Sequence, residues 1–453
     1  MLMTSTSLQE ALQSLPANAQ EAIVSHQFIA ASVIRALGFQ QGEVYPQFNT
    51  GDGAVDYAVR KTTESDVFVV TGSNPYLLIE LKGRDVSLEE DSPSYERTVR
   101  QLKRYLHAPN SKTVEWGIIT NSIHIQLFRK HGKVVYPATP CLEINLDNID
   151  EIIANIRQKV ENPSRALTVA IYNNKGGVGK TTTTINLAAV LKGETKKKIL
   201  VVDFDPHQQD LTNSLGLSPC DGDVYTALTN RDSDICSSIQ KYVVTRRNKK
   251  FDFFDVIPAD KKLIGLSNSN SDVVKLRQQL ILGMETLRQK LESLTFLYDY
   301  ILIDSPPNWQ VFSELAVHAA DVVLIPTKHD DISSLRNAAL AIKQFIPEAQ
   351  QKRSDGSPIA LPIFFNGGKP STKQKEIARK AIEDIIKQAK SEGFNNLRAY
   401  FYPKYTTARR NEDIFEVSSH ANIASAAFSQ IPAAYQNRTA HEYYLNLAKE
   451  YFL

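Results

Sequence analysis

Residues 175–182 combine glycine, lysine and threonine in the pattern of a phosphate-binding loop. They read Lys-Gly-Gly-Val-Gly-Lys-Thr-Thr, after an apolar run at 167–172 and before a helix-like run at 182–192. Glycine lets the backbone wrap a triphosphate closely, because it lacks a side chain and tolerates positive φ. Consecutive N–H groups and the helix N-terminus then face the anion. The pattern predicts that Lys180 reaches the β- and γ-phosphates and that the Thr181 hydroxyl holds Mg²⁺.

Three aspartates follow apolar runs further along the chain. Asp203 and Asp205 end the segment ILVVDFDP, and Asp304 ends the segment YDYILID. Carboxylates at the C-terminal ends of parallel strands lie where such sheets bind their ligands. We therefore expect Asp304 and Asp203 beside the metal ion and Asp205 beside the attacking water. An aspartate after a strand is also a common cap or turn former, but three in this order favour a site.

A second set of charged residues lies near the N-terminus. Asp56 falls in the strand-like run 54–59, and Glu80 and Lys82 stand two apart in LLIELK. Residues two apart in a strand project from the same face. Two carboxylates can hold Mg²⁺, and a lysine can stabilise an attacking hydroxide or a pentavalent phosphate. The alternative is a surface strand with a Glu–Lys ion pair.

The neighbouring sequence favours the metal site. LLIELK is otherwise apolar, as expected for a central strand. Charged side chains are rarely buried in such a strand unless they are paired or serve a function. Gln101 and Tyr105 stand four apart and share one face of a predicted helix. That helix also carries basic residues suited to a phosphate backbone, namely Arg97, Arg100, Lys103 and Arg104. A solvated helix face would explain these charges as well.

Short apolar runs alternate with helix-like segments after residue 166. This order predicts an α/β fold with a largely parallel sheet and crossover helices. The nearly continuous apolar character of the runs suits strands buried on both faces. Strands are expected at 167–172, 199–204, 253–258, 300–304, 321–326, 362–365 and 399–402.

The N-terminal part has a different order of elements. Residues 161–166 read as a linker of turn formers, so we place a first α/β domain at 1–160 and a second domain at 167–453. In the first domain we expect a helix at 21–39, strands at 54–59 and 76–82, a helix at 94–108 that a serine cap opens, and a hairpin at 116–128 that turns near Asn121 and Ser122.

The composition is that of an ordinary globular protein. The 453 residues are 42% hydrophobic and 23% charged, with a net charge of +2, so any basic surface must be local. Cys141, Cys220 and Cys236 are too widely spaced for a disulfide framework or a zinc cluster. The sequence contains neither a secretory signal nor an apolar run of about 20 residues. We expect a cytoplasmic protein that uses no membrane.

The phosphate-binding loop resembles the deviant Walker A motif of the ParA/MinD partition ATPases, which carry an extra lysine at its start. Asp203-Phe-Asp205-Pro resembles their Asp-x-Asp-Pro segment, and residues 298–307 resemble their Walker B segment. The resemblance covers about 167–453 and includes the segments 252–267, 319–327 and 364–366.

This resemblance implies ATP and Mg²⁺ as cofactors. It also implies an ATP-sandwich homodimer in which Lys175 reaches the nucleotide of the partner subunit, as an arginine finger does elsewhere. By the same resemblance Asn366 contacts adenine. The residues on the phosphates and Mg²⁺ would be Gly176, Gly177, Val178, Gly179, Lys180, Thr181 and Thr182.

The segment after the second predicted strand departs from the family. Many partition ATPases read Asp-Pro-Gln-Gly/Ala-Asn there, whereas residues 205–212 read Asp-Pro-His-Gln-Gln-Asp-Leu-Thr, one residue longer and with an extra acid. This longer segment leaves the rate of ATP hydrolysis and the geometry of the switch segment open. C-terminal arginines touch DNA in partition ATPases, and Lys404, Arg409 and Arg410 are candidates here, with a solvated loop as the alternative.

Asp56, Glu80-Leu-Lys82 and Gln101-Leu-Lys-Arg-Tyr105 together resemble the PD-(D/E)xK nuclease superfamily, in particular the N-terminal nuclease domain of type I restriction R subunits. The resemblance implies a Mg²⁺-dependent DNA endonuclease. Asp56 and Glu80 would hold the metal, and Lys82, Gln101 and Tyr105 would complete the catalytic set.

The resemblance of the first domain covers about 15–135 and includes the hairpin residues 118–121. Val55 stands where the superfamily name has proline, a common substitution. Glu21 matches an acidic residue on the first helix.

Two functional hypotheses follow. In the first, ATP drives dimerisation, the dimer binds DNA without sequence preference, and the first domain cuts DNA, with defence against foreign DNA as a role by analogy. In the second, the chain is a non-cleaving partition or positioning ATPase whose first domain only binds DNA or a partner. The lack of paired cysteines argues against a metal-cluster carrier. The sequence identifies neither a partner encoded in the same operon nor a preferred DNA sequence.

Overall fold

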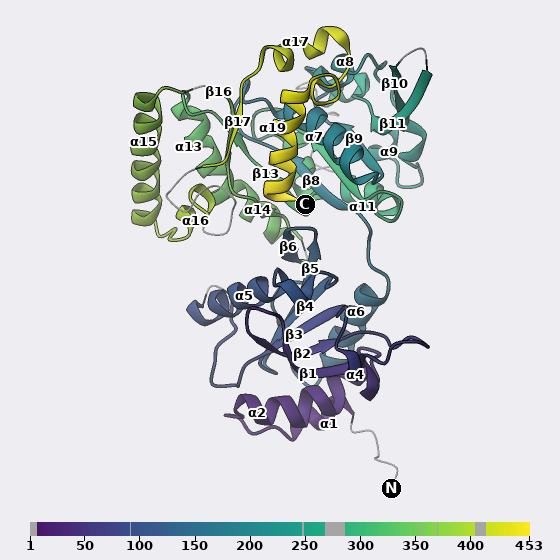
Figure 1. The fold of residues 1–453 in the computed structure, drawn as a ribbon, viewed down its shortest axis with the longest axis vertical. Helices are drawn as coiled ribbons and strands as arrows, with labels where there is room; N and C mark the ends of the chain where they lie inside the picture. The colour runs from purple at the N-terminus through teal and green to yellow at the C-terminus, as the bar shows by residue number, and fades with distance from the viewer. Residues whose placement is uncertain are drawn as a thin grey trace. The chain divides into compact units, whose positions relative to one another are not determined.

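The computed structural model describes residues 7–90, 92–246, 249–267, 286–353, 355–368, 370–403 and 414–453. The chain divides into two compact units, which we name by their order (Figure 1). The N-terminal unit holds residues 1–164 and 354–356, and the C-terminal unit holds 165–353 and 357–453. Lys404, Arg409 and Arg410 lie outside the described residues. No helix in the described ranges is long and apolar enough to cross a bilayer.

The N-terminal unit is built on a mixed sheet in the order β1-β2-β3-β4-β5-β6, with β7 paired to β5. β3 and β4 run parallel, and the other neighbours run antiparallel. The strands are β1 (Val44–Asn49), β2 (Ala54–Val59), β3 (Leu77–Leu81), β4 (Trp116–Thr120), β5 (His124–His131), β6 (Val134–Pro137) and β7 (Leu142–Glu143). The predicted strands and the predicted hairpin are confirmed.

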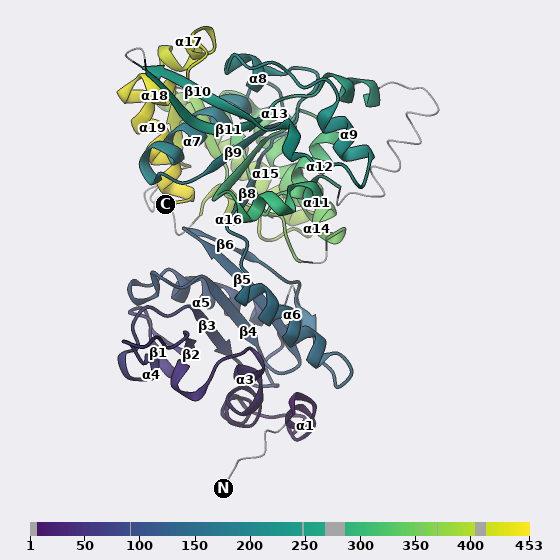
Figure 2. The same ribbon diagram turned by 90° about the vertical axis from the view of Figure 1, so that its right-hand side faces the viewer.

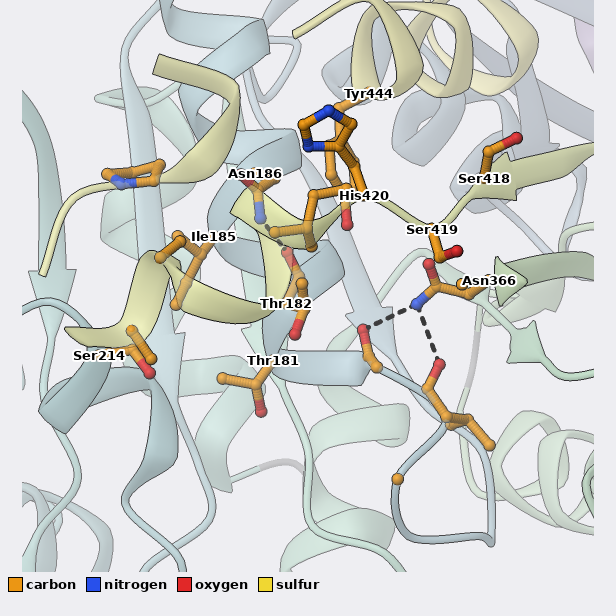
Figure 3. Close-up of a pocket in the computed structure, with 18 of the residues that line it drawn as sticks. Thr181, Thr182, Ile185, Asn186, Ser214, Asn366, Ser418, Ser419, His420 and Tyr444 are labelled. Atoms are coloured by element: carbon orange, nitrogen blue, oxygen red, sulfur yellow. Dashed lines mark hydrogen bonds between the residues drawn. The ribbon is translucent and has the colours of Figure 1, made fainter. Parts of the chain in front are cut away.

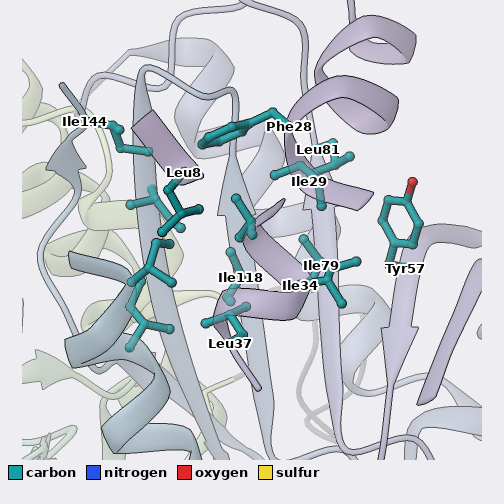
Figure 4. Packing of buried hydrophobic residues seen from close by; sticks show 14 of the residues in the cluster. Leu8, Phe28, Ile29, Ile34, Leu37, Tyr57, Ile79, Leu81, Ile118 and Ile144 are labelled. Carbon is teal, nitrogen blue, oxygen red and sulfur yellow. The ribbon is translucent and has the colours of Figure 1, made fainter. Parts of the chain in front are cut away.

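Helices cover both faces of this sheet. Leu8, Phe28, Ile29 and the helical stretch around them pack on one face, against Ile79 and Ile118 (Figure 4). The helical segments are α1 (Leu8–Gln13), α2 (Glu21–Ile23), the π-helix η1 (Val24–Val33), α3 (Ile34–Ala36), η2 (Gln41–Glu43), α4 (Phe68–Thr71), α5 (Pro93–Leu106), η3 (Pro109–Ser111) and α6 (Ile149–Glu161). The helix expected at 21–39 is thus a continuous stretch from α2 to α3 with a π-helical middle.

The helix α5 packs on the other face of the sheet. Its Leu102 and Leu106 join Leu78 and Ile119 in a second core. The predicted serine cap is wrong by two residues, because Ser92 accepts the hydrogen bond from the Tyr95 N–H and Pro93 starts the helix. Proline suits the first helical position, where its missing N–H has no intrahelical partner.

The C-terminal unit contains a largely parallel sheet in the order β10-β11-β9-β12-β8-β13-β15 (Figure 2). The pair β10–β11 is antiparallel, and all other pairs are parallel. A smaller parallel sheet has the order β14-β16-β17. The strands are β8 (Leu167–Ile171), β9 (Ile199–Asp203), β10 (Gln240–Arg246), β11 (Lys249–Ile257), β12 (Tyr300–Asp304), β13 (Val322–Leu324), β14 (Pro326–Thr327), β15 (Ile359–Ala360), β16 (Phe364–Gly368) and β17 (Glu416–Ser418).

The helix α7, which follows the phosphate-binding loop, lies against β8, β9, β11 and β12, and α19 lies beside it (Figures 1 and 2). The helical segments of this unit are α7 (Lys180–Thr195), α8 (Asp210–Ser214), α9 (Asp223–Thr229), η4 (Cys236–Ser238), η5 (Lys261–Ser267), α11 (Thr286–Glu292), η6 (Ser293–Phe296), α12 (Val311–Ala319), α13 (Ile332–Leu340), η7 (Ala341–Phe345), α14 (Ile346–Gln351), α15 (Thr372–Ser391), α16 (Leu397–Phe401), α17 (Ala421–Ser429), α18 (Ala433–Gln436) and α19 (Arg438–Tyr451). The predicted α/β fold class is confirmed.

Two predicted strands of this unit are wrong in detail. Residues 399–402 belong largely to α16, because Leu397 and Phe401, four apart, bury the same helical face. The run 321–326 splits between β13 and β14, which belong to different sheets. Sequence reasoning also missed β10, β15 and β17.

Candidate functional site

The phosphate-binding loop joins the end of β8 to the first turn of α7. Gly179 is the N-cap of α7 and has a φ of 84°, in the left-handed region that favours glycine. A Cβ atom at Gly179 would collide with the side-chain amide of Asn366. That amide donates to the carbonyls of Val178 (3.0 Å) and Gly179 (3.2 Å) and to the Thr183 hydroxyl (3.2 Å). Asn366 therefore fixes the loop from β16, a strand distant in sequence.

Asp304 meets the start of α7 where the parallel strands end. β12 pairs in register with β8 and β9, so Asp304 is level with Ile171 on one side and with Asp203 on the other. The Thr181 hydroxyl donates to Asp304 Oδ2 at 2.6 Å. Among the described residues, the buried Oδ1 atom of Asp304 has no hydrogen-bond partner. A hydroxyl beside a carboxylate with an unused oxygen fits a hard divalent cation.

Asp203 and Asp205 both accept hydrogen bonds from the segment that follows β9. Asp203 accepts from the backbone N–H (2.9 Å) and the hydroxyl (2.6 Å) of Thr212 and from the Asp205 N–H (3.2 Å). Asp205 accepts from the N–H groups of His207 (3.2 Å) and Gln208 (3.1 Å), within its own loop. Asp203 thus holds this loop in place, and the loop orients the Asp205 carboxylate.

Burial dominates the electrostatics of this cluster. It raises the pKa of Asp203 to about 6, although Thr212 opposes that shift. Burial also raises the pKa of Asp304, and the charge of Asp203 adds to the shift. For Lys180 burial lowers the pKa, and the charges of Asp304 and Asp205 oppose it. Crowded carboxylates of this kind favour a bound cation.

The two lysines of the loop differ in placement. Lys180 is buried, and its Nζ donates to the carbonyls of Lys175 (3.1 Å) and Asn173 (3.4 Å) across the loop. The Lys175 side chain is 42% exposed, with its Nζ 4.0 Å from Asp331 Oδ2. Lys180 can contact an anion bound in its own loop, whereas Lys175 is accessible from outside the subunit.

A cavity of about 350 Å³ opens beside the loop. Predicted residues in its wall are Gly177, Val178, Gly179, Thr181, Thr182 and Asn366 (Figure 3). Sequence reasoning missed the remainder of the wall, which includes Lys328, Ser418, Ser419, His420, Pro432 and Tyr444. These residues carry no motif, because the contacts come from strands and helices remote from the loop in sequence.

The predicted charged residues of the N-terminal unit come together at the end of β3. The Lys82 Nζ lies 2.6 Å from Glu80 Oε1 and 3.8 Å from an oxygen of Glu21. Asp56 Oδ2 accepts from the Leu81 N–H at 2.7 Å. Glu80, Lys82 and Asp56 therefore form one cluster across β2 and β3, with Glu21 at its edge.

Glu80 is the buried member of the cluster. Its side chain is 3% exposed, and in the described part of the chain its buried Oε2 atom has no hydrogen-bond partner. Burial raises the pKa of Glu80 to about 7, although the charge of Lys82 opposes the shift. Burial alone would lower the pKa of Lys82, but the charge of Glu80 raises it overall. Asp56 and the unused oxygen of Glu80 fit a cation.

The described residues contain no group of three or more histidine, cysteine or acidic side chains with metal-binding geometry. Each predicted cation site therefore offers few protein ligands. Such a site suits Mg²⁺, which keeps several waters and is often completed by a phosphate oxygen.

Gln101 and Tyr105 meet on the inward face of α5. The Gln101 side-chain amide donates to the Tyr105 hydroxyl at 3.1 Å. A Cβ atom at Gly53, in the loop before β2, would come within 3.1 Å of that hydroxyl. The pair therefore adjoins the loop that leads into the strand of Asp56. Arg104 lies over the Tyr105 ring and 3.5 Å from Asp52.

Comparison with known proteins concerns the C-terminal unit. A family model described as an AAA domain matches residues 166–353. The chain is 36% identical over 162 residues to the sporulation initiation inhibitor protein Soj of Bacillus subtilis, covering 35% of this chain and 57% of Soj. It is 37% identical to the chromosome partitioning protein ParA of Myxococcus xanthus, over 35% of this chain and 50% of that protein. The chain thus spans about half the length of the curated relatives it matches.

Solved structures that match this chain include a Cyanothece McdA–ATP complex. It has 18% sequence identity and a TM-score of 0.45, and the match covers 63% of this chain and 97% of that one. The septum site-determining protein MinD of Pyrococcus horikoshii, complexed with Mg-ADP, has 19% identity and a TM-score of 0.42, covering 63% and 95%. The sequence matches to Soj and ParA, together with the family model, make the C-terminal part of the chain similar to P-loop ATPases of the ParA type.

Proposed function

We propose that the C-terminal unit binds ATP with Mg²⁺ and hydrolyses it as a homodimer that binds DNA. The observation that carries the proposal is the Thr181–Asp304 hydrogen bond, with the unused Asp304 oxygen beside the loop. The triphosphate would lie on the N–H groups of the loop and on Lys180. The base and ribose would occupy the adjoining cavity. Bound Mg²⁺ would neutralise charge on the phosphate oxygens.

Residues around the loop then have separate roles. Thr181 and Asp304 hold the metal, and Asp203 lies beside it and also fixes the Asp205 loop. Asp205 orients the attacking water. The exposed Lys175 would reach the nucleotide of a second subunit. The similarity to Soj and to the chromosome partitioning protein ParA supports a role in which this unit acts on DNA.

The proposed ATPase activity of the C-terminal unit is tested by measuring nucleotide binding and phosphate release by the full chain. Wild-type protein should bind ATP and release phosphate only with Mg²⁺, and Lys180→Ala should lose both properties. Lys387→Ala is a matched control, because it removes an exposed lysine of α15 in the same unit that does not line the cavity. Equal ATP affinity in wild type and Lys180→Ala would refute the proposal.

For the N-terminal unit we propose a Mg²⁺-dependent DNA endonuclease. The supporting observation is the buried Glu80 carboxylate with an unused oxygen, held beside Asp56 and Lys82. Asp56 and Glu80 would hold the metal, which would polarise the scissile phosphate. Lys82 would stabilise the negative charge that develops on that phosphate. Defence against foreign DNA is the biological role we favour for this combination.

The endonuclease is tested with supercoiled plasmid and Mg²⁺, with and without ATP. Cleavage should disappear in Glu80→Gln and in Lys82→Ala, and should persist in Glu89→Gln, which alters an exposed glutamate of the same unit. If wild type leaves plasmid intact under all conditions while ATP-dependent DNA binding persists, the non-cleaving partition ATPase is the correct function.

A further inference from the structure

Gln47 lies directly opposite Asp56 on the neighbouring strand. The ladder between β1 and β2 pairs Pro46 with Tyr57 and Phe48 with Val55, which brings Gln47 level with Asp56. The Gln47 side-chain amide donates to Asp56 Oδ1 at 3.2 Å. Cross-strand neighbours have Cβ atoms about 5 Å apart, so a glutamine amide can reach an opposite carboxylate.

The backbone of Gln47 is unusual for a strand. Its φ is 49°, in the left-handed region that non-glycine residues rarely adopt. Such a conformation is strained and persists where the surroundings enforce it, most often at functional sites. The break in regular strand geometry therefore coincides with the residue opposite Asp56.

Two donors together fix the Asp56 carboxylate. The Leu81 N–H holds Oδ2 at 2.7 Å, and Gln47 holds Oδ1 from the opposite side. An ionised carboxylate only accepts hydrogen bonds, so the glutamine must present its NH₂ group. The Leu81 contact ties Asp56 to β3 beside Glu80, and the Gln47 contact limits its rotation.

We infer that Gln47 is a positioning residue that orients Asp56 for a divalent cation shared with Glu80. This inference rests on the proposed endonuclease site. A carboxylate held by hydrogen bonds binds a metal with less loss of side-chain freedom, and loss of such an outer contact typically weakens metal affinity by 10–100-fold. Sequence reasoning did not find Gln47, because its register opposite Asp56 depends on how β1 pairs.

The test measures Mn²⁺ binding to the full chain by electron paramagnetic resonance, without nucleotide or DNA. All proteins compared carry Asp304→Asn, which removes the cation site proposed beside the phosphate-binding loop. Gln47→Gly keeps a residue that tolerates positive φ but removes the amide, and Gln47→Met keeps the side-chain length without an N–H donor. Both variants should bind Mn²⁺ about tenfold more weakly than wild type, with unchanged melting temperature. Gln41→Gly, which alters an exposed glutamine nearby, should bind like wild type.

Plasmid cleavage supplies a second readout. In Gln47→Gly the Mn²⁺ concentration for half-maximal cleavage should rise about tenfold while the maximal rate changes little. Wild-type Mn²⁺ affinity in both Gln47 variants would overturn the inference and leave the endonuclease proposal standing. Equal Mn²⁺ affinity in wild type and Asp56→Asn would instead overturn the proposed site itself.

Discussion

The Thr181 hydroxyl donates a 2.6 Å hydrogen bond to Asp304 Oδ2 across 123 residues of sequence. The bond joins the first turn of α7 to the end of β12. Because Asp304 is also level with Asp203 on β9, three elements converge at one edge of the sheet. A hydroxyl and two carboxylates therefore lie close together beside the loop in the folded chain.

Asp304→Asn should strongly slow Mg²⁺-dependent ATP hydrolysis while retaining nucleotide binding in EDTA. The amide keeps the shape of the side chain and can still accept from Thr181, but it lacks the negative charge that attracts the cation. We expect a fall in kcat of about a hundredfold or more, as for loss of one transition-state contact. Phosphate release and fluorescent-nucleotide binding measure the two effects.

Asp330→Asn is the control for this change, because it alters an exposed aspartate of the same unit and should hydrolyse ATP like wild type. Hydrolysis by Asp304→Asn at the wild-type rate would show that the metal lies elsewhere.

Asn366→Ala should weaken binding of ATP, GTP and tripolyphosphate to a similar extent. The amide of Asn366 supports the carbonyls of Val178 and Gly179, so its loss loosens the loop that contacts the phosphates. Loss of a buried amide with several partners costs about 1–3 kcal/mol, which corresponds to roughly 5–150-fold in affinity. Isothermal titration with the three ligands provides the measurement.

The pattern across those ligands separates two roles for Asn366. A residue that reads adenine would change the ratio of ATP to GTP affinity and leave tripolyphosphate unaffected. That result would contradict the loop-supporting role.

The sequence allowed prediction of the features whose contacts are local or periodic. The loop at 175–182 is contiguous, and strands such as β8, β9 and β12 are apolar runs that their neighbours bury on both faces. Residues 399–402 were misjudged because aromatic residues also favour strands, and only packing reveals the face shared by Leu397 and Phe401. The cavity residues Ser418–His420 were missed because tertiary folding alone brings β17 to the loop.

The Arg165–Asp299 pair should stabilise the C-terminal unit in a pH-dependent way. Arg165 donates from two nitrogens to Asp299 at 2.7 and 3.0 Å, and the Lys198 N–H donates to the same carboxylate at 2.8 Å. Burial would raise the pKa of Asp299, but these hydrogen bonds outweigh it and lower the pKa overall. The stabilisation is therefore present above the unfolded-state pKa of about 3.9 and is lost as pH falls through the folded-state value.

Asp299→Asn should consequently lower the free energy of unfolding by about 1–2 kcal/mol at pH 7, and this difference should shrink as the pH falls below about 3.9 and Asp299 becomes protonated in the folded protein. Urea unfolding of both proteins across this range measures the difference. Asp252→Asn, which breaks the exposed pair with Lys241, should have less effect at every pH. A difference for Asp299→Asn that does not change with pH would contradict the assignment.

Tyr105→Phe should slow plasmid cleavage while leaving the fold intact. The change removes the hydroxyl that accepts from Gln101 and keeps the ring packed in the core beside Leu102. If this hydroxyl helps place the DNA phosphate or its water, cleavage should fall about tenfold or more. Plasmid nicking rates and circular dichroism give the two measurements.

Tyr57→Phe is the matched control, because Tyr57 is equally buried and its hydroxyl pairs with Ser25. Tyr57 belongs to the core packed by η1 rather than by α5, so removal of its hydroxyl should leave the cleavage rate unchanged. Equal rates for Tyr105→Phe and wild type would remove Tyr105 from the site.

The two loop lysines should complement each other between subunits. Lys180 lies buried over its own loop, whereas Lys175 is 42% exposed, so only Lys175 is available to another subunit. Lys175→Ala should bind ATP but not hydrolyse it, and Lys180→Ala should not bind ATP. In a mixed dimer the Lys175→Ala subunit supplies an intact loop, and the Lys180→Ala subunit supplies the missing lysine.

An equimolar mixture should therefore regain hydrolysis that neither variant shows alone. Random pairing of two-site dimers sets an upper limit of about a quarter of the wild-type rate. Phosphate release measured over a range of protein concentrations checks this, and a mixture as inactive as its components would place the action of Lys175 within its own subunit.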